Sequence, residues 1–270
     1  MILVETWKSW KNLTPPQRTF LTDPRMEATL PRVEWVDGLR KLISFSLQVK
    51  TTQLILRISG GALVPLAIVL AIVFDSGWPL LLWPISGVAF LLAWYVARFD
   101  VPGFVDQFIL PFLVLLGEET EGESPLSLKL DLRGYLCDDK RVMDPSNPSR
   151  PTAYYRDAWF TGNATLADGS RLAWKVSDFL RYRKSYKCKY RMDVEVLLSA
   201  KAKDYAVATR IPEDKFRRKV RQGEKRHVVR VRSATKNPQY YMPRSYAELV
   251  RTIGAAYQCL IPVDTDPKKS

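Results

Sequence analysis

The chain has 270 residues, 47% of them apolar and 26% charged, and its formal net charge at pH 7 is +13. This composition excludes a disordered or collagen-like chain, because the apolar fraction is that of a folded protein. One histidine, His227, and three widely separated cysteines provide no metal-ligand spacing and would leave any nucleophilic triad dependent on a single residue, so we expect no enzyme, no metal and no cofactor.

We expect residues 1–53 to form an N-terminal cytoplasmic region, part of which fits both a helical and a strand periodicity. Asp23 and Pro24 are typical of a helix start. Apolar residues spaced by three or four positions favour a helix that begins near Glu34 and enters an apolar segment. The alternation of apolar and polar residues over 43–50 also fits a strand, and we favour the helix.

Two uncharged and mainly apolar runs follow, over residues 58–74 and 78–97. Each is about as long as the hydrocarbon layer of a bilayer requires, and only the turn-forming residues Asp75, Ser76 and Gly77 separate them. Aromatic residues near both ends of the second run are typical of membrane interfaces. The sequence therefore predicts a hairpin of two transmembrane helices over 54–98, with a buried soluble hairpin as the alternative.

The flanking charges predict the orientation of this hairpin. Residues 1–57 hold nine Lys or Arg and five acids, whereas the tip holds one Asp, so we expect both termini in the cytoplasm and the protein in a bacterial inner membrane. Neither run has an ionisable residue at its centre, which argues against a transport site. Small residues around Gly60 and Gly87 are candidate contact faces within the hairpin or between copies in an oligomer.

Residues 99–123 contain a third apolar run, interrupted by Asp106 and Gln107, and then an acidic linker. The apolar positions recur at helical spacing, which predicts an interfacial helix that lies along the membrane surface or packs beneath the following domain. A third span is the alternative, and it would move the C-terminal domain across the membrane.

Residues 124–270 have the pattern of a β-rich cytoplasmic domain with α+β character. Alternation predicts strands over 126–132, 159–166, 171–176, 186–198, 205–211 and 225–233, and Asp168–Gly169 fits a hairpin turn. Pro212 and Gly223 bound a short basic helix, and a capping box from Ser245 to Glu248 begins a last amphipathic helix. We expect an antiparallel β-barrel or sandwich with one or two packed helices.

Most of the positive charge lies between residues 171 and 236, where 21 Lys or Arg face 7 Asp or Glu. The candidate residues for binding a partner or an anionic ligand are Arg181, Arg183, Lys184, Lys187, Lys189, Arg191, Arg217, Arg218, Arg221, Arg226, Arg230 and Arg232. The occupant could be the anionic lipid leaflet, an acidic protein, or a nucleic acid or nucleotide stacked on Tyr182, Tyr186 and Tyr190. A solvated strand face without a partner is the simplest interpretation.

We find no P-loop and no nucleic-acid-binding motif. The leading hypothesis is a non-catalytic integral membrane protein that anchors a basic β-rich domain at the cytoplasmic surface, as a scaffold or accessory subunit of a membrane assembly. The alternative is a ligand-gated effector, in which a phosphate-bearing ligand binds the basic domain and the hairpins oligomerise. In layout alone, a two-span hairpin followed by a β-rich domain is similar to membrane-anchored nucleotide-sensing effectors of bacterial antiphage systems.

Overall fold

The computed structural model describes residues 2–75, 77–120, 124–134, 137–142, 152–183, 189–212, 214–237 and 245–263. The chain forms two compact units. The first, the helical unit, contains Met1–Asp23 and Gly38–Pro102. The second, the sheet unit, contains Pro24–Asp37 and Gly103–Ser270.

The helical unit is built from two short helices, one long helix and a return helix. Its elements are α1 (Ile2–Asn12), α2 (Pro15–Thr22), most of α3 (Arg32–Val73), η1 (Trp78–Leu81), α4 (Leu82–Val96) and η2 (Ala97–Phe99). Residues 43–50 are helical, so the helix interpretation is confirmed. Leu39, Leu42 and Phe45 lie on one buried stripe of α3, and burial at this spacing accounts for the helix despite the alternation.

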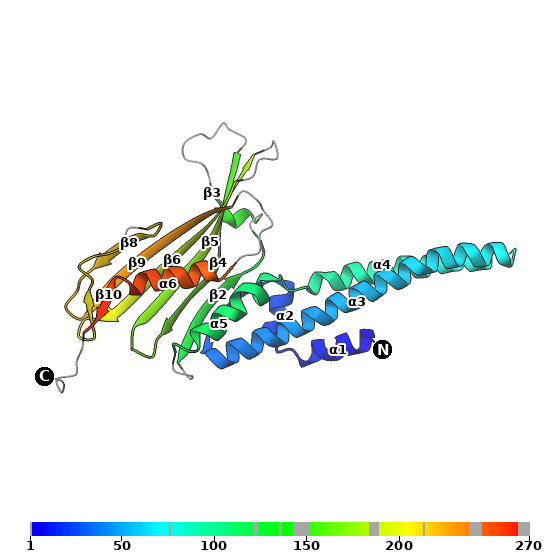
Figure 1. Ribbon diagram of the computed structural model, residues 1–270. Helices are drawn as coiled ribbons and strands as arrows, with labels where there is room; N and C mark the ends of the chain where they lie inside the picture. The colour runs from blue at the N-terminus through cyan, green and yellow to red at the C-terminus, as the bar shows by residue number, and fades with distance from the viewer. Residues whose placement is uncertain are drawn as a thin grey trace. The chain divides into compact units, whose positions relative to one another are not determined.

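The helices α3 and α4 run side by side as a hairpin (Figure 1). The Ser86 hydroxyl donates a 2.6 Å hydrogen bond to the Gly60 carbonyl, and a Cβ on Gly60 would lie 3.2 Å from that of Ala89. By length and composition, Arg32–Val73 and Leu82–Phe99 are each long and apolar enough to cross a membrane. Only 11% of the most apolar window of each segment is buried, which is unlike the core hairpin of a soluble protein.

The sheet unit is α+β, as predicted. Its strands are β1 (Arg25–Pro31), β2 (Pro125–Asp131), β3 (Arg141–Val142), β4 (Thr152–Thr165), β5 (Arg171–Arg183), β6 (Lys189–Lys201), β7 (Tyr205–Val207), β8 (Arg217–Arg221), β9 (Arg226–Asn237) and β10 (Leu260–Pro262). Among the described residues, eight strands form one antiparallel sheet in the order β1-β2-β4-β5-β6-β9-β8, with β3 beside β4. Strands β7 and β10 form a separate pair.

Several strand predictions are confirmed, two local predictions are wrong, and one strand was missed. Strands β2, β4, β5, β6 and β9 overlap the predicted ones, except that residues 186–188 lie outside the described residues, and the strand predicted over 205–211 is limited to β7. Gly169 has the expected positive φ of 74° in the β4–β5 turn. The predicted basic helix is strand β8, because side chains 217–221 alternate between two faces. Asp23 ends α2 rather than starting a helix, and the following strand β1 was not predicted.

The sheet is open, so the prediction of a closed barrel or a two-sheet sandwich is wrong. Its path through the described strands ends at β1 on one side and β8 on the other. Helices cover one face instead of a second sheet: η3 (Val105–Ile109), α5 (Leu110–Leu116) and α6 (Ala247–Tyr257). Figure 1 shows α5 and α6 on this covered face, with α6 crossing β6 and β9.

Of the two positions predicted for the interfacial helix within 99–123, along the membrane surface or beneath the following domain, the structure shows the second, because the helical part belongs to the core of the sheet unit. Phe108 and Phe112 are 0% and 1% exposed. Phe108 lies edge-on to Trp159, and Phe112 lies edge-on to Phe160 and Trp174. Because these rings bury the apolar face of η3 and α5, that face is not available to lipid, and the segment packs beneath the sheet.

Candidate functional site

The uncovered side of the sheet, which we call the open face, is strongly cationic. In β6 and β9 the even residues of β6 and the odd residues of β9 are buried beneath α6, so the alternate residues lie on the open face. On β5, β6, β8 and β9, the open face carries the cations Arg171, Lys175, Arg181, Arg191, Lys201, Arg217, Lys219, Arg221, Arg226, Arg230 and Arg232. The acids of the same strands on this face are Asp193 and Glu195.

The edge of the open face, over β8 and β9, sets like charges directly opposite each other. Arg217 pairs in register with Arg232, and Lys219 pairs with Arg230. Glu195 on β6 forms ion pairs with both Arg230 and Arg232. Like charges at directly opposed positions of an antiparallel pair are destabilising, and one glutamate cannot neutralise the whole cluster. An anionic occupant of this edge would relieve that repulsion.

A second cluster on the open face combines rings with guanidinium groups. The Tyr154 and Phe179 rings lie with their centroids 5.8 Å apart. Arg181 stands 5.6 Å from the Tyr154 centroid and Arg191 stands 5.1 Å from the Phe179 centroid. Arg191 also pairs with Asp193 at 2.7 Å. The face of each ring is therefore already in a cation–π contact with an arginine of the protein.

One predicted binding residue, Arg218, is on the covered face and has a structural role. Its guanidinium donates to both carboxylate oxygens of Asp214 and to the carbonyl oxygens of Pro212 and Ala255. The hydrogen bonds that Arg218 donates to Asp214 raise the pKa of Arg218 and lower the pKa of Asp214. Arg218 therefore ties β8 and its preceding loop to α6, and it is not available to a partner on the open face.

The other predicted residues divide by position. Arg181, Arg191, Arg217, Arg221, Arg226, Arg230 and Arg232 lie on the open face, Arg183 and Lys189 lie at strand ends, and Lys184 and Lys187 lie outside the described residues. Arg226 donates to the carbonyl oxygens of Ser199 and Gly169. Of the tyrosines expected to stack on a ligand, Tyr190 donates instead to Asp178 on the covered side, at 2.6 Å.

Sequence reasoning missed the rings of the open face, Tyr154 and Phe179, and the cation Lys175. The relevant signal was available in part, because β5 alternates and Lys175, Phe179 and Arg181 share one parity. Tyr154 could not be assigned to the same face from parity, because β4 changes register between Asp157 and Phe160.

An ionic network joins the C-terminal end of β2 to β4. Lys140 is 7% exposed and reaches Asp131 at 3.0 Å and Asp157 at 2.8 Å. Burial works to raise the pKa of Asp131, but hydrogen bonds from Arg133 and Lys140 outweigh it, so the pKa falls to about 2. Burial dominates at Asp157 and raises its pKa. Lys140 is therefore the cation that compensates the buried charge of Asp157, and it shares the half-buried Asp131 with Arg133.

Glu248 is a second charged anchor inside the sheet unit, and it does not form the predicted capping box. Its carboxylate accepts hydrogen bonds from Ser233 on β9 and from the Lys215 ammonium at 3.0 Å. Burial works to raise the pKa of Glu248, and the hydrogen bonds from Ser233 and Lys215 lower it overall. This residue joins α6 to β9 and to the segment that precedes β8.

We expect Glu248→Ala to lower the free energy of unfolding by about 1–3 kcal/mol, because Ser233 loses its acceptor in a buried position. The pKa of Glu248 is lowered in the fold, so its contribution is present above the ordinary glutamate pKa and is lost as the pH falls through the folded value. Urea unfolding at neutral and acidic pH measures both effects. Arg251→Ala, which removes an exposed ion-pair partner of Glu248 at 3.8 Å, should change stability little.

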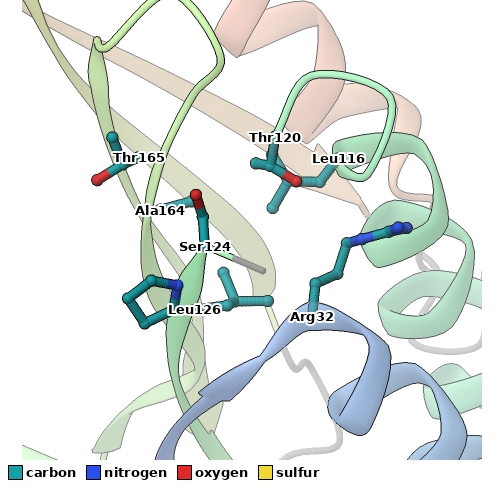
Figure 2. Close-up of a pocket in the computed structure, with 8 residues that line it drawn as sticks. Arg32, Leu116, Thr120, Ser124, Leu126, Ala164 and Thr165 are labelled. Atoms are coloured by element: carbon teal, nitrogen blue, oxygen red, sulfur yellow. The ribbon is translucent and has the colours of Figure 1, made fainter. Parts of the chain in front are cut away.

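A small pocket in the sheet unit contains none of the open-face cations. It encloses about 190 Å³, including open solvent, and its lining residues are Arg32, Leu116, Thr120, Ser124, Pro125, Leu126, Ala164 and Thr165. Figure 2 shows Arg32 on one side and Ala164 and Thr165 on the other. Arg32 is its one cation, so it does not form the convergent basic pocket that a phosphate-bearing ligand requires.

In the described part of the chain, no group of three or more His, Cys, Asp or Glu could hold a metal ion. The open face of the sheet is the candidate functional site because of its excess of cations, and the chemistry it offers is the recognition of negative charge. Comparison of the chain with protein-family models, with curated proteins and with solved structures finds no match.

Proposed function

We propose that the protein is a non-catalytic integral membrane protein whose α3–α4 hairpin anchors the sheet unit at the cytoplasmic surface, where the open face holds an acidic partner protein. It would act as a scaffold or accessory subunit of a membrane assembly. The observation that carries this proposal is the division of the sheet into a face covered by its own helices and an open face with far more cations than acids.

The exposure of the hairpin supports the membrane part of the proposal. Large apolar side chains remain uncovered along both helices, including Ile58, Ile72 and Leu91, which are 62%, 75% and 65% exposed. An apolar surface this long requires a partner, and lipid chains provide one. The excess of Lys and Arg in residues 1–57 over the tip then favours cytoplasmic termini.

The distribution of the cations favours a macromolecular partner over a small ligand. They lie on four neighbouring strands rather than around one cavity, and the strands present them on one side of a continuous ladder. Glu195 and Asp193 sit among them as fixed acceptors, which gives the face a pattern of charge rather than a uniform field. Patterned charge is typical of protein docking, where complementarity provides specificity.

Charge reversal at the β8 edge tests the proposal. We expect the triple variant Arg217→Glu, Lys219→Glu, Arg221→Glu to bind the acidic partner about 10- to 100-fold more weakly, with most of the change in the association rate. The fold should survive, because each new acid faces Arg232, Arg230 or Val228 across the ladder. The readout is the set of proteins retained by the full chain in native-detergent purification, followed by binding measurements with the retained partner.

The matched control carries the same charge change on exposed loop residues outside the sheet: Lys203→Glu, Arg210→Glu, Lys225→Glu. The proposal requires the control to bind like the original chain. If both triple variants lose the partner equally, the interaction depends on net charge alone and the open face is not a docking site. Retention of the partner by the β8 variant would contradict the proposal directly.

A ligand-gated membrane effector is the second candidate, and the ring cluster of the open face is the observation that favours it. Tyr154 and Phe179 beside Arg181 and Arg191 could stack a base and hold a phosphate, provided that the guanidinium groups move off the rings. Native mass spectrometry of the purified chain distinguishes the two. A homo-oligomer that retains a nucleotide, and loses it in Phe179→Ala, would replace the scaffold proposal.

A further inference from the structure

Helix α1 is held against α3 within the helical unit. The hydroxyl groups of Thr6 and Thr52 share a 2.8 Å hydrogen bond, and the Trp10 ring lies 5.8 Å from Phe45 and 5.2 Å from Phe99 between centroids. The Arg18 guanidinium donates to the last carbonyl oxygens of α1, at Trp10 and Lys11. These contacts fix one face and the C-terminal end of the helix.

The contacts also give α1 a direction. Thr6 meets Thr52, whereas Trp10, further along α1, meets the earlier residue Phe45 of α3. The two helices are therefore antiparallel, and the N-terminal end of α1 points the same way as the apolar part of α3, as Figure 1 shows. At about 1.5 Å of rise per residue, Val4 lies only about 3 Å beyond Thr6, which is the level of Leu54, where the apolar run of α3 begins.

The opposite face of α1 is exposed and changes character along the helix. Val4 and Trp7, towards the apolar part of the hairpin, are 54% and 58% exposed. Lys8 and Lys11 follow on the same face, and the Lys11 ammonium stands 5.6 Å from the Trp7 ring. Glu5 is exposed at the margin of this face, in the first turn, where the helix dipole favours an acid.

At the level of α1, the C-terminal end of α4 and the neighbouring part of α3 also carry aromatic and basic side chains. Arg98 lies over the Trp94 ring at 3.8 Å, and Tyr95 meets Phe99, which meets Trp10 of α1. Lys50 pairs with Asp100 at 3.4 Å. Tryptophan and tyrosine next to basic side chains are typical of the headgroup layer of a bilayer. Helix α1 extends this belt with a tryptophan and two lysines.

We propose that the N-terminal half of α1 is a lipid-binding element, with Val4 and Trp7 inserted at the boundary between headgroups and acyl chains and Lys8 and Lys11 against anionic lipid phosphates. The inference rests on the proposed membrane insertion of the hairpin. It assigns the membrane interface to α1, which continues the exposed apolar surface of the hairpin, rather than to the segment over 99–123.

Spin labels on single cysteines test this in the full chain. The background replaces Cys137, Cys188 and Cys259 by alanine. A melting temperature equal to that of the original chain is the criterion that this background folds. Labels are placed by Val4→Cys, Trp7→Cys and Lys11→Cys, with Ile68→Cys and Lys203→Cys as references.

The chain is reconstituted in nanodiscs of phosphatidylcholine and phosphatidylglycerol. Collisions with oxygen, which concentrates in lipid, are compared with collisions with a water-soluble nickel chelate.

We expect the ratio of oxygen to nickel collisions to increase in the order Lys203, Lys11, Trp7, Val4, Ile68. A high ratio at Ile68 with values at Val4 and Trp7 equal to that at Lys203 would overturn the α1 inference and leave the membrane anchor intact. A low ratio at Ile68 itself would overturn both. Because Val4→Cys retains Trp7, the result at position 4 does not depend on removing the aromatic anchor.

Discussion

Lys140→Met should lower the free energy of unfolding of the sheet unit by about 3–5 kcal/mol, because it leaves Asp157 charged, buried and without its cation. Asp131 retains Arg133, at 2.8 Å, so the loss is concentrated at Asp157. Urea unfolding of the full chain in detergent, followed by tryptophan fluorescence to which the buried Trp159 and Trp174 contribute, measures it. The variant's deficit should narrow on acidification towards about pH 4, because Asp157 has a raised pKa in the fold and becomes neutral there first.

Two further variants separate the buried charge from the loss of a surface ion pair. Lys129→Met, on β2, removes the partner of Glu27 on β1 from an exposed ion pair at 2.6 Å and should change stability by less than about 1 kcal/mol. Adding Asp157→Asn to Lys140→Met should recover part of the lost stability, because no buried charge then stands alone. Equal losses in Lys129→Met and Lys140→Met would contradict the assigned role of Lys140.

The second large effect is expected at Phe112, whose buried ring packs edge-on against Phe160 and Trp174. Phe112→Ala should lower the free energy of unfolding by about 3–5 kcal/mol through lost contacts and the cavity that remains. Leu115→Ala on the same helix, at a side chain 37% exposed, provides the control and should cost clearly less. Urea midpoints of the two variants give the comparison. A small effect at Phe112 would restore the interpretation of this segment as a helix lying in lipid.

The hairpin could be predicted because its signal is local. Two runs of uncharged residues separated by Asp75, Ser76 and Gly77 fix the number of helices and the position of the turn without any tertiary information. The strands β4 and β5 are similarly local, since Asp168 and Gly169 form the turn between two alternating segments. In both cases the partner of each element is its neighbour in the chain.

The parts that sequence reasoning missed depend on distant residues. Strand β1 pairs with β2, so that Glu27 lies opposite Lys129, and nothing near Glu27 indicates that partner. Lys140 follows two acids in what resembles a solvated turn, yet its essential partner, Asp157, belongs to another strand. For the apolar run over 105–116, the sequence left open whether the helix lies along a membrane or beneath the following domain, and only its contacts with Trp159 and Trp174 of the sheet select the second position.

The candidate site was predicted in its charge and not in its geometry. The density of Arg and Lys over 171–236 is visible in the sequence, but their division between two faces requires the strand register. Pro212 and Gly223 are typical helix boundaries and led to β8 being assigned as a helix, which would have placed Arg217, Arg218 and Arg221 on one surface. In the strand, Arg218 lies opposite Val231, on the side away from its two neighbours.

The position of β8 at the edge of the sheet affects how neighbouring copies of the protein can associate. An unpaired edge strand exposes backbone donors and acceptors that can template pairing with another chain, and copies concentrated on a surface would meet often. Among the described strands, this edge is made of Arg217–Arg221, with four cations in five residues. Strand pairing requires an approach of about 4.8 Å, which is shorter than the Debye length of about 8 Å at physiological ionic strength. The cations of two such edges would therefore repel each other with only partial screening at that separation, so two molecules are kept from pairing their sheets through β8.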